Sequence, residues 1–407
     1  MDPTFRFLHA GDLHLERVPG GLAEVPDHLR SALADAPYRA AERVFDAAIK
    51  HRVDFVVLAG DVIAPQAAGP RGIVFLTEQF EKLVDAGIRV YWAGSPTDGF
   101  DSWADVWTLP DHVHRFASDR VERMIHHRAG EPLAQVLGTS VSRDTMIRGA
   151  DYQAADDLFA VSVAHGVADA ESLARRTIPY WALGGEHARR TLMSGTVTAH
   201  YCGTPQGRTP SESGPHGCTL VQVDETERVR TTFLPTDAVR YSHERVVIDP
   251  SMPLASLGQL LNERASELLI DPFGPELLVR WTIEGSPALL RELHAGNHTT
   301  ELLSQLRTEY GAKQPAAWSV TLEPAPVEVS EELYDEETLL GEFLRTARHC
   351  AEHPEEPISL EHLLAERHLA GTLGALASLD DSQLRHQVLA EAAALGTELL
   401  SPAEDRP

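Results

Sequence analysis

The amino-acid sequence predicts an α/β fold in which two facing mixed β-sheets are flanked by helices, followed by a small α+β unit and a helical C-terminal region. Three observations lead to this prediction. The first part alternates apolar strand-like runs with amphipathic segments, a series of short strands follows, and the last part is rich in Leu, Ala and Glu. Alternating strands and helices indicate a parallel sheet, and the later short strands supply a second sheet that faces it.

The N-terminal elements are expected in the order strand, helix, strand, helix, strand. The runs 5–12, 53–61 and 88–94 are strand-sized, and 53–61 is continuously apolar, as expected of a strand buried on both faces. Residues 37–52 and 73–87 place apolar side chains along one helical face. This order implies right-handed crossovers between parallel strands, whose carboxyl ends share one edge of the sheet.

Short strands continue after about residue 112 without long helices between them. They are expected at 122–128, 133–141, 158–166, 180–185, 196–203, 218–224 and 228–235. The strand at 122–128, which carries His126 and His127, is expected to be exposed. Packed against the first sheet, these strands form the second layer of a sandwich.

The pattern restarts near residue 240, which suggests a domain boundary. Strand, helix, strand and helix are expected in turn at 244–250, 254–269, 276–285 and 297–311, and the remainder is helical. A chain of 407 residues is long for a single core. We therefore predict three parts: 1–240, a small α+β capping domain at 241–327, and an acidic helical region at 328–407.

The formal charge of −26, from 61 acidic and 35 basic residues, limits the class of partner. A protein that grips DNA alone usually carries a basic patch, because phosphate neutralisation supplies much of the affinity. Residues 331–407 hold 17 acidic and 5 basic residues. This tail is either a solvated acidic surface or a docking surface for a basic partner, and DNA would be reached through a complex.

Three cysteines and the apolar runs bear on the compartment. Cys202, Cys218 and Cys350 are scattered and odd in number, so no disulfide framework is implied. No apolar run approaches the roughly 20 residues that span a bilayer, and the N-terminus lacks the pattern of a signal peptide. A cytoplasmic protein without a membrane span is expected.

Acidic and histidine side chains follow several predicted strands. "HAGDLHL" and "LAGDVI" each place an Asp just beyond an apolar strand, giving Asp12, His14 and Asp61. "VAHGV" gives His165 and "ALGGEH" gives His187. Since ligands bind at the carboxyl ends of parallel strands, these side chains are expected to converge. Carboxylates with imidazoles suit Mn, Fe or Zn better than Ca.

This ordered set resembles the calcineurin-like metallophosphoesterase superfamily. Within it, "FLHAGDLHL" and residues 200–224, "HYCGTPQGRTPSESGPHGCTLVQVD", are similar to the DNA-repair exonuclease branch, the SbcD- and YhaO-like nuclease subunits. The resemblance covers about residues 4–240 and implies the four-layer sandwich of that superfamily. Residues 242–326 match the family's DNA-facing capping domain in position alone.

The resemblance also implies two cation sites, with Mn²⁺ as the expected ion. The first site is complete, and its ligands are Asp12, His14, Asp61 and His187. The second would share Asp61 and use His165. At the second site's two remaining ligand positions, an Asn and a His of the family, this chain has Ser95 and Gly185.

Three further residues bear on whether the centre is active. The family's proton-donating His aligns with Pro96, which has no proton to give. Asp98 and Glu186, with Ser95, are candidate substitute ligands. Loss of a general acid alone typically slows a reaction by roughly 10²–10⁴-fold, so activity is expected to be weak or lost.

Three functions remain open at this point. The first is a metal-dependent exonuclease of the DNA-repair type with a reduced second site. The family implies a coiled-coil ATPase partner, for which the helices at 331–400 are the candidate dock, and homodimers formed through the phosphoesterase domain. The second is a catalytically silent structural subunit of such a nuclease–ATPase complex. The third is a small-molecule phosphodiesterase, which suits the acidic surface better than duplex DNA does.

Overall fold

The computed structural model describes most of the chain. The described residues are 5–22, 24–98, 107–118, 120–141, 143, 146–155, 158–249, 253–285, 289–290, 292–293, 297–325, 329–353, 355–356, 358, 379 and 382–400. Much of the predicted C-terminal helical region, 359–378, therefore lies outside them.

Contacts divide the chain into two compact units. One comprises Met1–His243, Arg264–Arg280 and Leu306–Val320, and the other comprises Glu244–Glu263, Trp281–Gln305 and Thr321–Pro407. The domain boundaries expected near residues 240 and 327 stay predictions.

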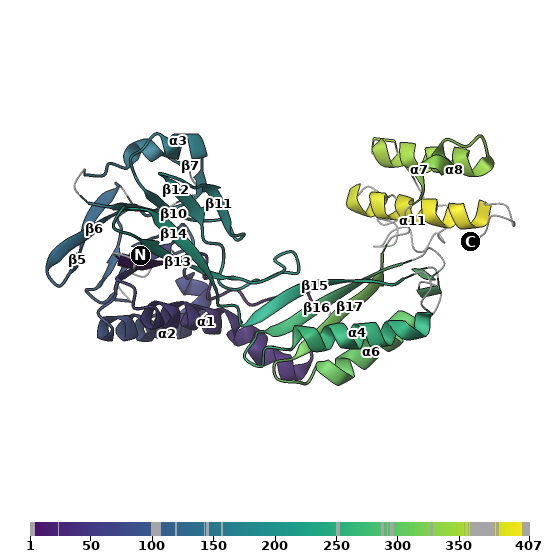
Figure 1. The fold of residues 1–407 in the computed structure, drawn as a ribbon, viewed down its shortest axis with the longest axis horizontal. Helices are drawn as coiled ribbons and strands as arrows, with labels where there is room; N and C mark the ends of the chain where they lie inside the picture. The colour runs from purple at the N-terminus through teal and green to yellow at the C-terminus, as the bar shows by residue number, and fades with distance from the viewer. Residues whose placement is uncertain are drawn as a thin grey trace. The chain divides into compact units, whose positions relative to one another are not determined.

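The first sheet has six strands in the order β14-β13-β1-β2-β3-β4 (Figure 1). Strands β1 to β4 pair in parallel, whereas β13 pairs antiparallel with both β1 and β14. Their bounds are Phe5–Ala10 for β1, Phe55–Ala59 for β2, Arg89–Ala93 for β3, Val113–Arg115 for β4, Gly217–Val223 for β13 and Val229–Pro235 for β14. The carboxyl ends of β1 and β2 therefore lie at one edge.

The second sheet also has six strands, in the order β11-β12-β10-β8-β6-β5. Its central strands β6, β8, β10 and β12 run parallel, and β5 and β11 are antiparallel at the two edges. The bounds are Glu122–Arg128 for β5, Glu131–Gly138 for β6, Ala160–His165 for β8, Tyr180–Gly184 for β10, Arg190–Met193 for β11 and Thr198–Tyr201 for β12. A two-stranded sheet of β7 (Met146–Ile147) and β9 (Val167–Ala168) and the helices η1 (Gly149–Asp151) and α3 (Ala170–Ala174) accompany it.

Aromatic side chains fill the space between the two sheets. The Phe7 and Phe55 rings stack with centroids 4.9 Å apart, and Tyr180 of the second sheet meets Phe7 edge-on at 5.3 Å. Helices α1 (Asp27–Lys50) and α2 (Pro65–Asp85) cover the other face of the first sheet, where Phe45 and Phe80 are fully buried. This confirms the predicted α/β fold of mixed sheets flanked by helices.

Helix α1 starts ten residues earlier than the prediction of 37–52. Pro37 lies inside it, at a position where proline normally ends or kinks a helix. The additional turns bury Leu29 and Leu33 against Leu278 and Ala316. These contacts join residues far apart in the chain, so the local sequence pattern does not predict them. Burying an aliphatic side chain contributes about 1.5–3 kcal/mol, enough to offset the proline.

The exposed strand expected at 122–128 is only partly exposed. His127 faces solvent, but His126 is 4% exposed and its ring lies 4.8 Å from that of Phe55. Alternate side chains of a strand point to opposite faces, so one of two adjacent histidines must face the other sheet. The expectation was wrong for His126.

Elements of the α+β segment follow the predicted order. Strands β15 (Val239–Val247), β16 (Glu276–Glu284) and β17 (Ala317–Pro324) form one sheet. Helices α4 (Leu257–Leu268) and α6 (His298–Tyr310), with the short η2 (Leu254–Ser256), lie side by side along it (Figure 1). The Ser266 and Tyr310 hydroxyls join the two helices at 3.0 Å.

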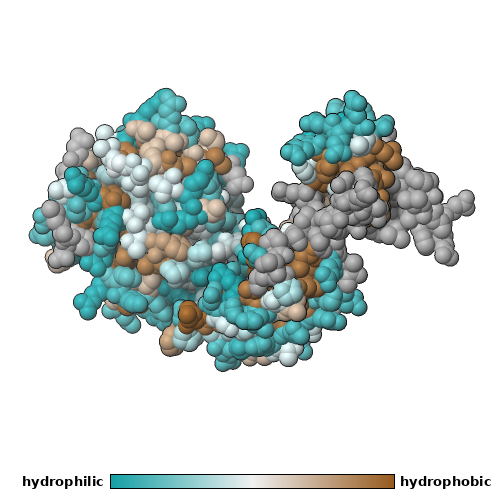
Figure 2. All heavy atoms as spheres, turned by 45° about the vertical axis from the view of Figure 1, so that its right-hand side comes forward, coloured by the Kyte–Doolittle hydropathy of each residue, from teal (hydrophilic) through white to brown (hydrophobic). Residues whose placement is uncertain are grey.

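The C-terminal region contains α7 (Glu331–Tyr334), α8 (Leu339–Glu352) and α11 (Ser382–Leu400). Leu340, Leu344 and Ala347 of α8 bury an apolar stripe with Ala393 of α11. Figure 2 shows hydrophobic atoms on one side of these helices and hydrophilic atoms on the other. None of the helices in the described part of the chain is both long and apolar enough to cross a membrane.

Candidate metal centre

Two loops at the ends of β1 and β2 hold a strained backbone at the predicted ligands. Asp12, His14 and Asp61 have φ of 53°, 44° and 51°, a left-handed conformation that costs a non-glycine residue about 1–3 kcal/mol. Two hydrogen bonds join the loops: Asp12 N donates to Gly60 O at 2.9 Å, and His14 N donates to Asp61 O at 2.9 Å. Strain maintained in this way is concentrated at functional sites.

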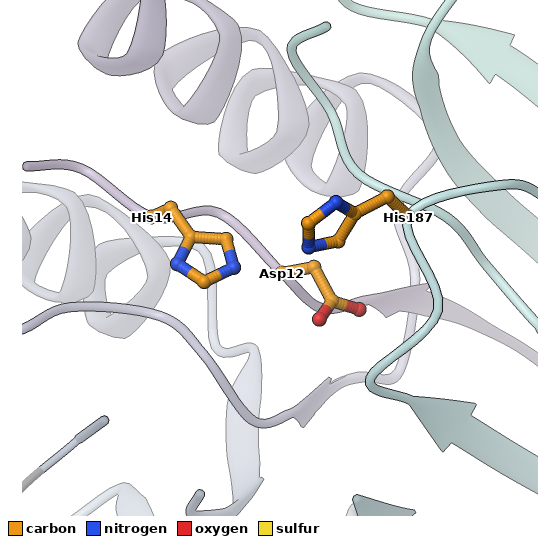
Figure 3. A group of neighbouring side chains, drawn as sticks. All are labelled: Asp12, His14 and His187. Carbon is orange, nitrogen blue, oxygen red and sulfur yellow. The ribbon is translucent and has the colours of Figure 1, made fainter. Parts of the chain in front are cut away.

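Four strand ends bring five predicted ligands together. Asp12 and His14 follow β1, Asp61 follows β2, His165 ends β8 and His187 follows β10. Donor atoms of Asp12, His14 and His187 lie within 4.8 Å of one another, as do those of Asp12, Asp61 and His165. Figure 3 shows the Asp12 carboxylate and the His14 and His187 rings gathered around one space. The two groups share Asp12.

Asp61 lies between the two imidazoles of different sheets. Its Oδ2 is 3.3 Å from His14 Nε2 and 3.9 Å from His165 Nε2. Burial alone would raise the pKa of Asp61, but the field of His165 and the hydroxyls of Ser95 and Thr97 hold the pKa below its usual value. The carboxylate is therefore ionised, and it lies close to a histidine from each group of donors, although Asp12 is the residue that the two groups share.

His14 is buried, and its ring nitrogens lie near carboxylates of Glu16 and Asp61 without a hydrogen bond to either. It is 1% exposed, and neither nitrogen makes a hydrogen bond within the described chain. Asp61 Oδ1 is also buried without a hydrogen-bond partner there. Burial lowers the pKa of His14, so the ring is neutral and keeps a lone pair. Buried polar atoms without partners are rare, and here they face a space between ligand-type groups.

The tautomer of His165 is fixed by the backbone. Its Nδ1 lies 3.0 Å from Ala59 O, a carbonyl that can only accept, so Nδ1 carries the proton. The other ring nitrogen, Nε2, is on the side of Asp61, 3.9 Å from its Oδ2. Gly60 has φ of 80°, and a Cβ at that position would overlap the His165 ring. Glycine is therefore required for the approach of this histidine.

The tautomer of His187 is fixed by Glu212, which sequence reasoning did not single out. His187 Nδ1 donates to Glu212 Oε1 at 2.8 Å, so its Nε2 is free to bind a cation. Burial would raise the pKa of Glu212, but hydrogen bonds from His187 and from Arg208 N lower it to about 2. A carboxylate behind a histidine is the usual outer partner of a metal-binding imidazole.

Asp12 is held by the backbone of Gly185. Gly185 N donates to both oxygens of the Asp12 carboxylate, at 3.1 and 3.0 Å. Gly185 has φ of 99°, and a Cβ there would touch the His165 ring. Burial raises the pKa of Asp12, and the Gly185 N–H opposes that rise. A cation in contact with the carboxylate would favour its charged form in the same way.

Two more unanticipated side chains adjoin the centre. Glu16 Oε1 lies 3.4 Å from His14 Nδ1, and Glu16 Oε2 accepts from Ala64 N at 2.9 Å. Arg208 is buried, and its Nη2 lies 3.5 Å from Glu212 Oε1. Glu212 and Arg208 belong to the 200–224 segment that carries the resemblance, but that segment alone assigns them no role.

The substitute ligands expected from sequence are placed differently from one another. Ser95 is buried, and its hydroxyl lowers the pKa of Asp61. The same Oγ accepts from Thr97 N and Asp98 N at 3.2 and 3.3 Å. Pro96 follows it in the same loop and offers no proton. Glu186 is outside both groups of donors and pairs with Arg190, whose Nε donates to it at 2.9 Å.

Asp98 uses its carboxylate to join two loops. Oδ1 accepts from Val62 N and Ile63 N at 2.8 and 3.1 Å, and Oδ2 accepts from Ser95 N at 2.8 Å. Burial raises the pKa of Asp98 to about 6, against the effect of these donors. The side chain fastens the Asp61 loop to the Ser95 loop.

The residues present fit a divalent cation. Buried carboxylates, two histidines with preset tautomers and one histidine with unpartnered nitrogens form the mixed oxygen and nitrogen set that Mn, Fe and Zn prefer. His165 is oriented by Ala59 O and His187 by Glu212, as metal-binding histidines usually are by a second contact.

Comparison with known proteins finds similarity to a family model, to a curated protein and to a solved structure. Residues 5–94 match the sequence model of the calcineurin-like phosphoesterase family. The chain is 26% identical over 335 residues to the uncharacterized metallophosphoesterase YhaO of Bacillus subtilis, covering 78% of this chain and 81% of the relative. The crystal structure of a dimetal phosphatase from Danio rerio aligns with a TM-score of 0.35 and 9% identity, over 57% of this chain and 99% of the other. Residues 5–94 are therefore similar to the calcineurin-like phosphoesterase family, and most of the chain is similar to the Bacillus relative.

Proposed function

We propose that this protein is a metal-dependent phosphoesterase of the DNA-repair exonuclease type, with one complete cation site and a weakened second site. One observation carries the proposal: donor atoms of Asp12, His14 and His187 lie together, as do those of Asp12, Asp61 and His165, and buried atoms of His14 and Asp61 in these groups make no hydrogen bond among the described residues. The two ring nitrogens of His14 lie 3.3 and 3.4 Å from carboxylate oxygens of Asp61 and Glu16 without making a hydrogen bond among the described residues, an arrangement suited to binding a cation.

The chain's residues divide the work at this centre. Asp12, His14, Asp61 and His187 would hold the first cation, Mn²⁺ in our proposal. When bound, the ion polarises a phosphoryl oxygen and lowers the pKa of a coordinated water. Glu212 keeps His187 in the tautomer that binds through Nε2. Burial keeps bulk water away from Asp12 and His14, which strengthens every charge interaction inside.

The second site is weaker because two of its ligand positions carry other residues. His165 and Asp61 remain, but Ser95 offers a hydroxyl in place of an amide and Gly185 offers no side chain. Asp98 and Glu186 make other contacts, with backbone N–H groups and Arg190 respectively. With Pro96 at the family's proton donor, the leaving group must take its proton from water. We therefore propose slow turnover.

The exonuclease role rests on the resemblance of residues 4–240 and on the C-terminal helices. The chain has no Gly-rich phosphate loop, so ATP would be handled by a coiled-coil ATPase partner. On α8 and α11, Leu339, Leu395 and Leu399 are exposed, which supports a dock in this region. Since the net charge is −26, we propose that DNA is engaged within a complex or a homodimer.

Two other functions have a specific observation in their favour. Pro96 and Ser95 favour a catalytically silent subunit that keeps the partner interface. The acidic surface favours a small-molecule phosphodiesterase, because duplex DNA would be repelled. All three share the cation site and differ in what it does.

Hydrolysis with a matched variant separates these functions. With excess Mn²⁺, we expect slow release from a chromogenic phosphodiester and slow degradation of linear DNA. Asp61→Asn should abolish both, since it removes the carboxylate between the two histidines. Asp224→Asn, in an exposed turn far from the centre in sequence and contacts, is the control and should retain both activities.

Each result has a distinct meaning. Hydrolysis of the small diester without DNA cleavage would favour the small-molecule function. No hydrolysis of either substrate by a chain that binds Mn²⁺ would leave the silent subunit. Activity that survives Asp61→Asn would refute the proposed site.

A further inference from the structure

Arg208 is a buried arginine whose terminal nitrogens are unsatisfied. The residue is 6% exposed, and neither Nη1 nor Nη2 makes a hydrogen bond to any described residue. Burial lowers the pKa of its guanidinium, but arginine remains charged at all ordinary pH values. Its charge is balanced by an ion pair with Glu212, but a guanidinium has five N–H donors, so hydrogen-bonding capacity remains at Nη1 and Nη2.

The side chain lies against the cation centre. Its Nη2 is 3.5 Å from Glu212 Oε1, the same oxygen that accepts from His187 Nδ1 at 2.8 Å. Its charge also lowers the pKa of His14 and opposes the rise in the pKa of Asp12. The guanidinium therefore contacts Glu212, which in turn binds the predicted ligand His187. It also interacts electrostatically with two further predicted ligands, Asp12 and His14.

The Nη groups of the Arg208 guanidinium make no hydrogen bonds that stabilise the fold among the described residues. The structural work of Arg208 falls to its backbone: N donates to Glu212 Oε2 at 2.6 Å, and O accepts from Gly20 N at 2.8 Å and Tyr241 Oη at 3.3 Å. Oε1 of Glu212 already takes the His187 proton. The ion pair with this oxygen is too long for a hydrogen bond, which leaves both Nη groups available.

We propose that Arg208 binds a non-bridging oxygen of the phosphoryl group at the cation centre. The proposal rests on the proposed function and adds a substrate-binding residue to it. A guanidinium presents N–H donors in a planar fork that matches two phosphoryl oxygens. It supplies positive charge at a centre where Ser95 and Gly185 weaken the second cation and Pro96 removes the acid.

A substrate-binding role and a structural role of Arg208 predict different effects of its replacement on Mn²⁺ affinity. Removing the charge of Arg208 should leave Mn²⁺ affinity equal or higher, because two positive charges no longer repel, while phosphate affinity falls. A residue that only kept Glu212 and His187 in place would, when replaced, weaken both. The two ligands therefore separate the alternatives without an activity assay.

The test is calorimetric titration of the full chain with Mn²⁺, and with inorganic phosphate both in excess Mn²⁺ and in chelator. We compare wild type with Arg208→Gln, Arg208→Lys and the control Arg175→Gln, an exposed arginine paired with Glu171. Arg208→Gln should weaken phosphate binding by roughly 10- to 100-fold, as expected for a lost hydrogen bond between charged groups. Arg208→Lys should lie between, because it keeps the charge and loses the fork, and the control should match wild type.

The outcomes are decisive in each case. Equal phosphate affinity in wild type and in any folded Arg208 variant overturns the proposal, as does a wild-type chain that binds no phosphate in either condition. If Arg208→Gln does not fold, Arg208→Lys decides alone. Failure to bind Mn²⁺ would instead refute the proposed function, and the titrations in chelator would still decide the role of Arg208.

Discussion

At the scale of single residues, the centre depends on which nitrogen of each histidine carries the proton. His165 is fixed by a neutral carbonyl, Ala59 O, whereas His187 is fixed by an ionised carboxylate, Glu212. A carboxylate raises the basicity of the opposite nitrogen more than a carbonyl does, which strengthens its bond to a cation. Among the two, His187 should therefore depend more strongly on its partner.

Glu212→Gln tests this dependence. Glutamine keeps the shape and can still accept from Nδ1, but it loses the charge that Glu212 holds through its pKa of about 2. We expect Mn²⁺ affinity to fall by roughly 10- to 100-fold. Calorimetric titration measures it, with Glu171→Gln on the exposed α3 as the control. Unchanged affinity in Glu212→Gln would show that the carboxylate does not act through His187.

At the scale of elements, loops rather than helices or strands decide the geometry of the centre. The β1 and β2 ends are paired by backbone bonds, and Asp98 fastens the Asp61 loop to the segment after β3 through three N–H donors. Three left-handed non-glycine residues persist because these contacts over-determine them. The strands fix where each loop begins, and the loop conformation sets the direction of the ligand side chains.

The longer strands of the two sheets were predictable from their apolar runs, whereas the short strands β4, β7, β9 and β11 were not, because so few residues show no clear periodicity. The start of α1 was not, since Leu29 and Leu33 pack against residues more than 200 positions away. The side of β5 that is buried was also not predictable. Two adjacent histidines look equivalent in sequence until the opposite sheet determines which one faces inward.

His126 of β5 makes stability depend on pH. Its ring packs on Phe55 and its Nδ1 lies 3.1 Å from Tyr91 Oη. Burial lowers its pKa to about 4, whereas the unfolded chain takes up the proton near the ordinary value of 6.5. The contribution of the neutral ring is therefore complete above about pH 6.5 and is lost as the pH falls toward about 4, at about 1.4 kcal/mol per pH unit.

Urea unfolding at pH 7 and pH 5 measures this effect. His126→Gln can still bond Tyr91 and does not titrate, so it should lose about 2 kcal/mol less stability than wild type between the two pH values. Chelator in both buffers removes any contribution from bound cation. Identical pH dependence in the two proteins would contradict a buried neutral His126.

At the scale of the whole molecule, the sequence predicts which strand ends converge, but it does not predict which side chains contact and orient the ligands there. Asp12, Asp61 and His165 follow from strand order, since parallel strands share an edge. Glu212 lies 25 residues after His187, and Arg208 reaches the centre through a loop, so only the folded path reveals their contacts. Side chains that orient ligands carry no spacing signal of their own.

The acidic charge of the chain has a consequence at this scale too. A cation centre built from several carboxylates attracts divalent ions but repels polyanions, and the net charge of −26 adds to that repulsion. Binding of DNA should therefore require a basic partner surface, while a small phosphodiester needs none. Arg208 is the buried positive charge by which either substrate would be held.

Metal content tests the central claim most directly. The full chain is loaded with Mn²⁺, passed through a desalting column and measured by inductively coupled plasma mass spectrometry beside Asp12→Asn. We predict about one retained ion per chain in wild type and almost none in the variant, because Asp12 is shared by both groups of donors. No ion retained by wild type, or equal retention by the two proteins, would contradict a cation centre at these residues.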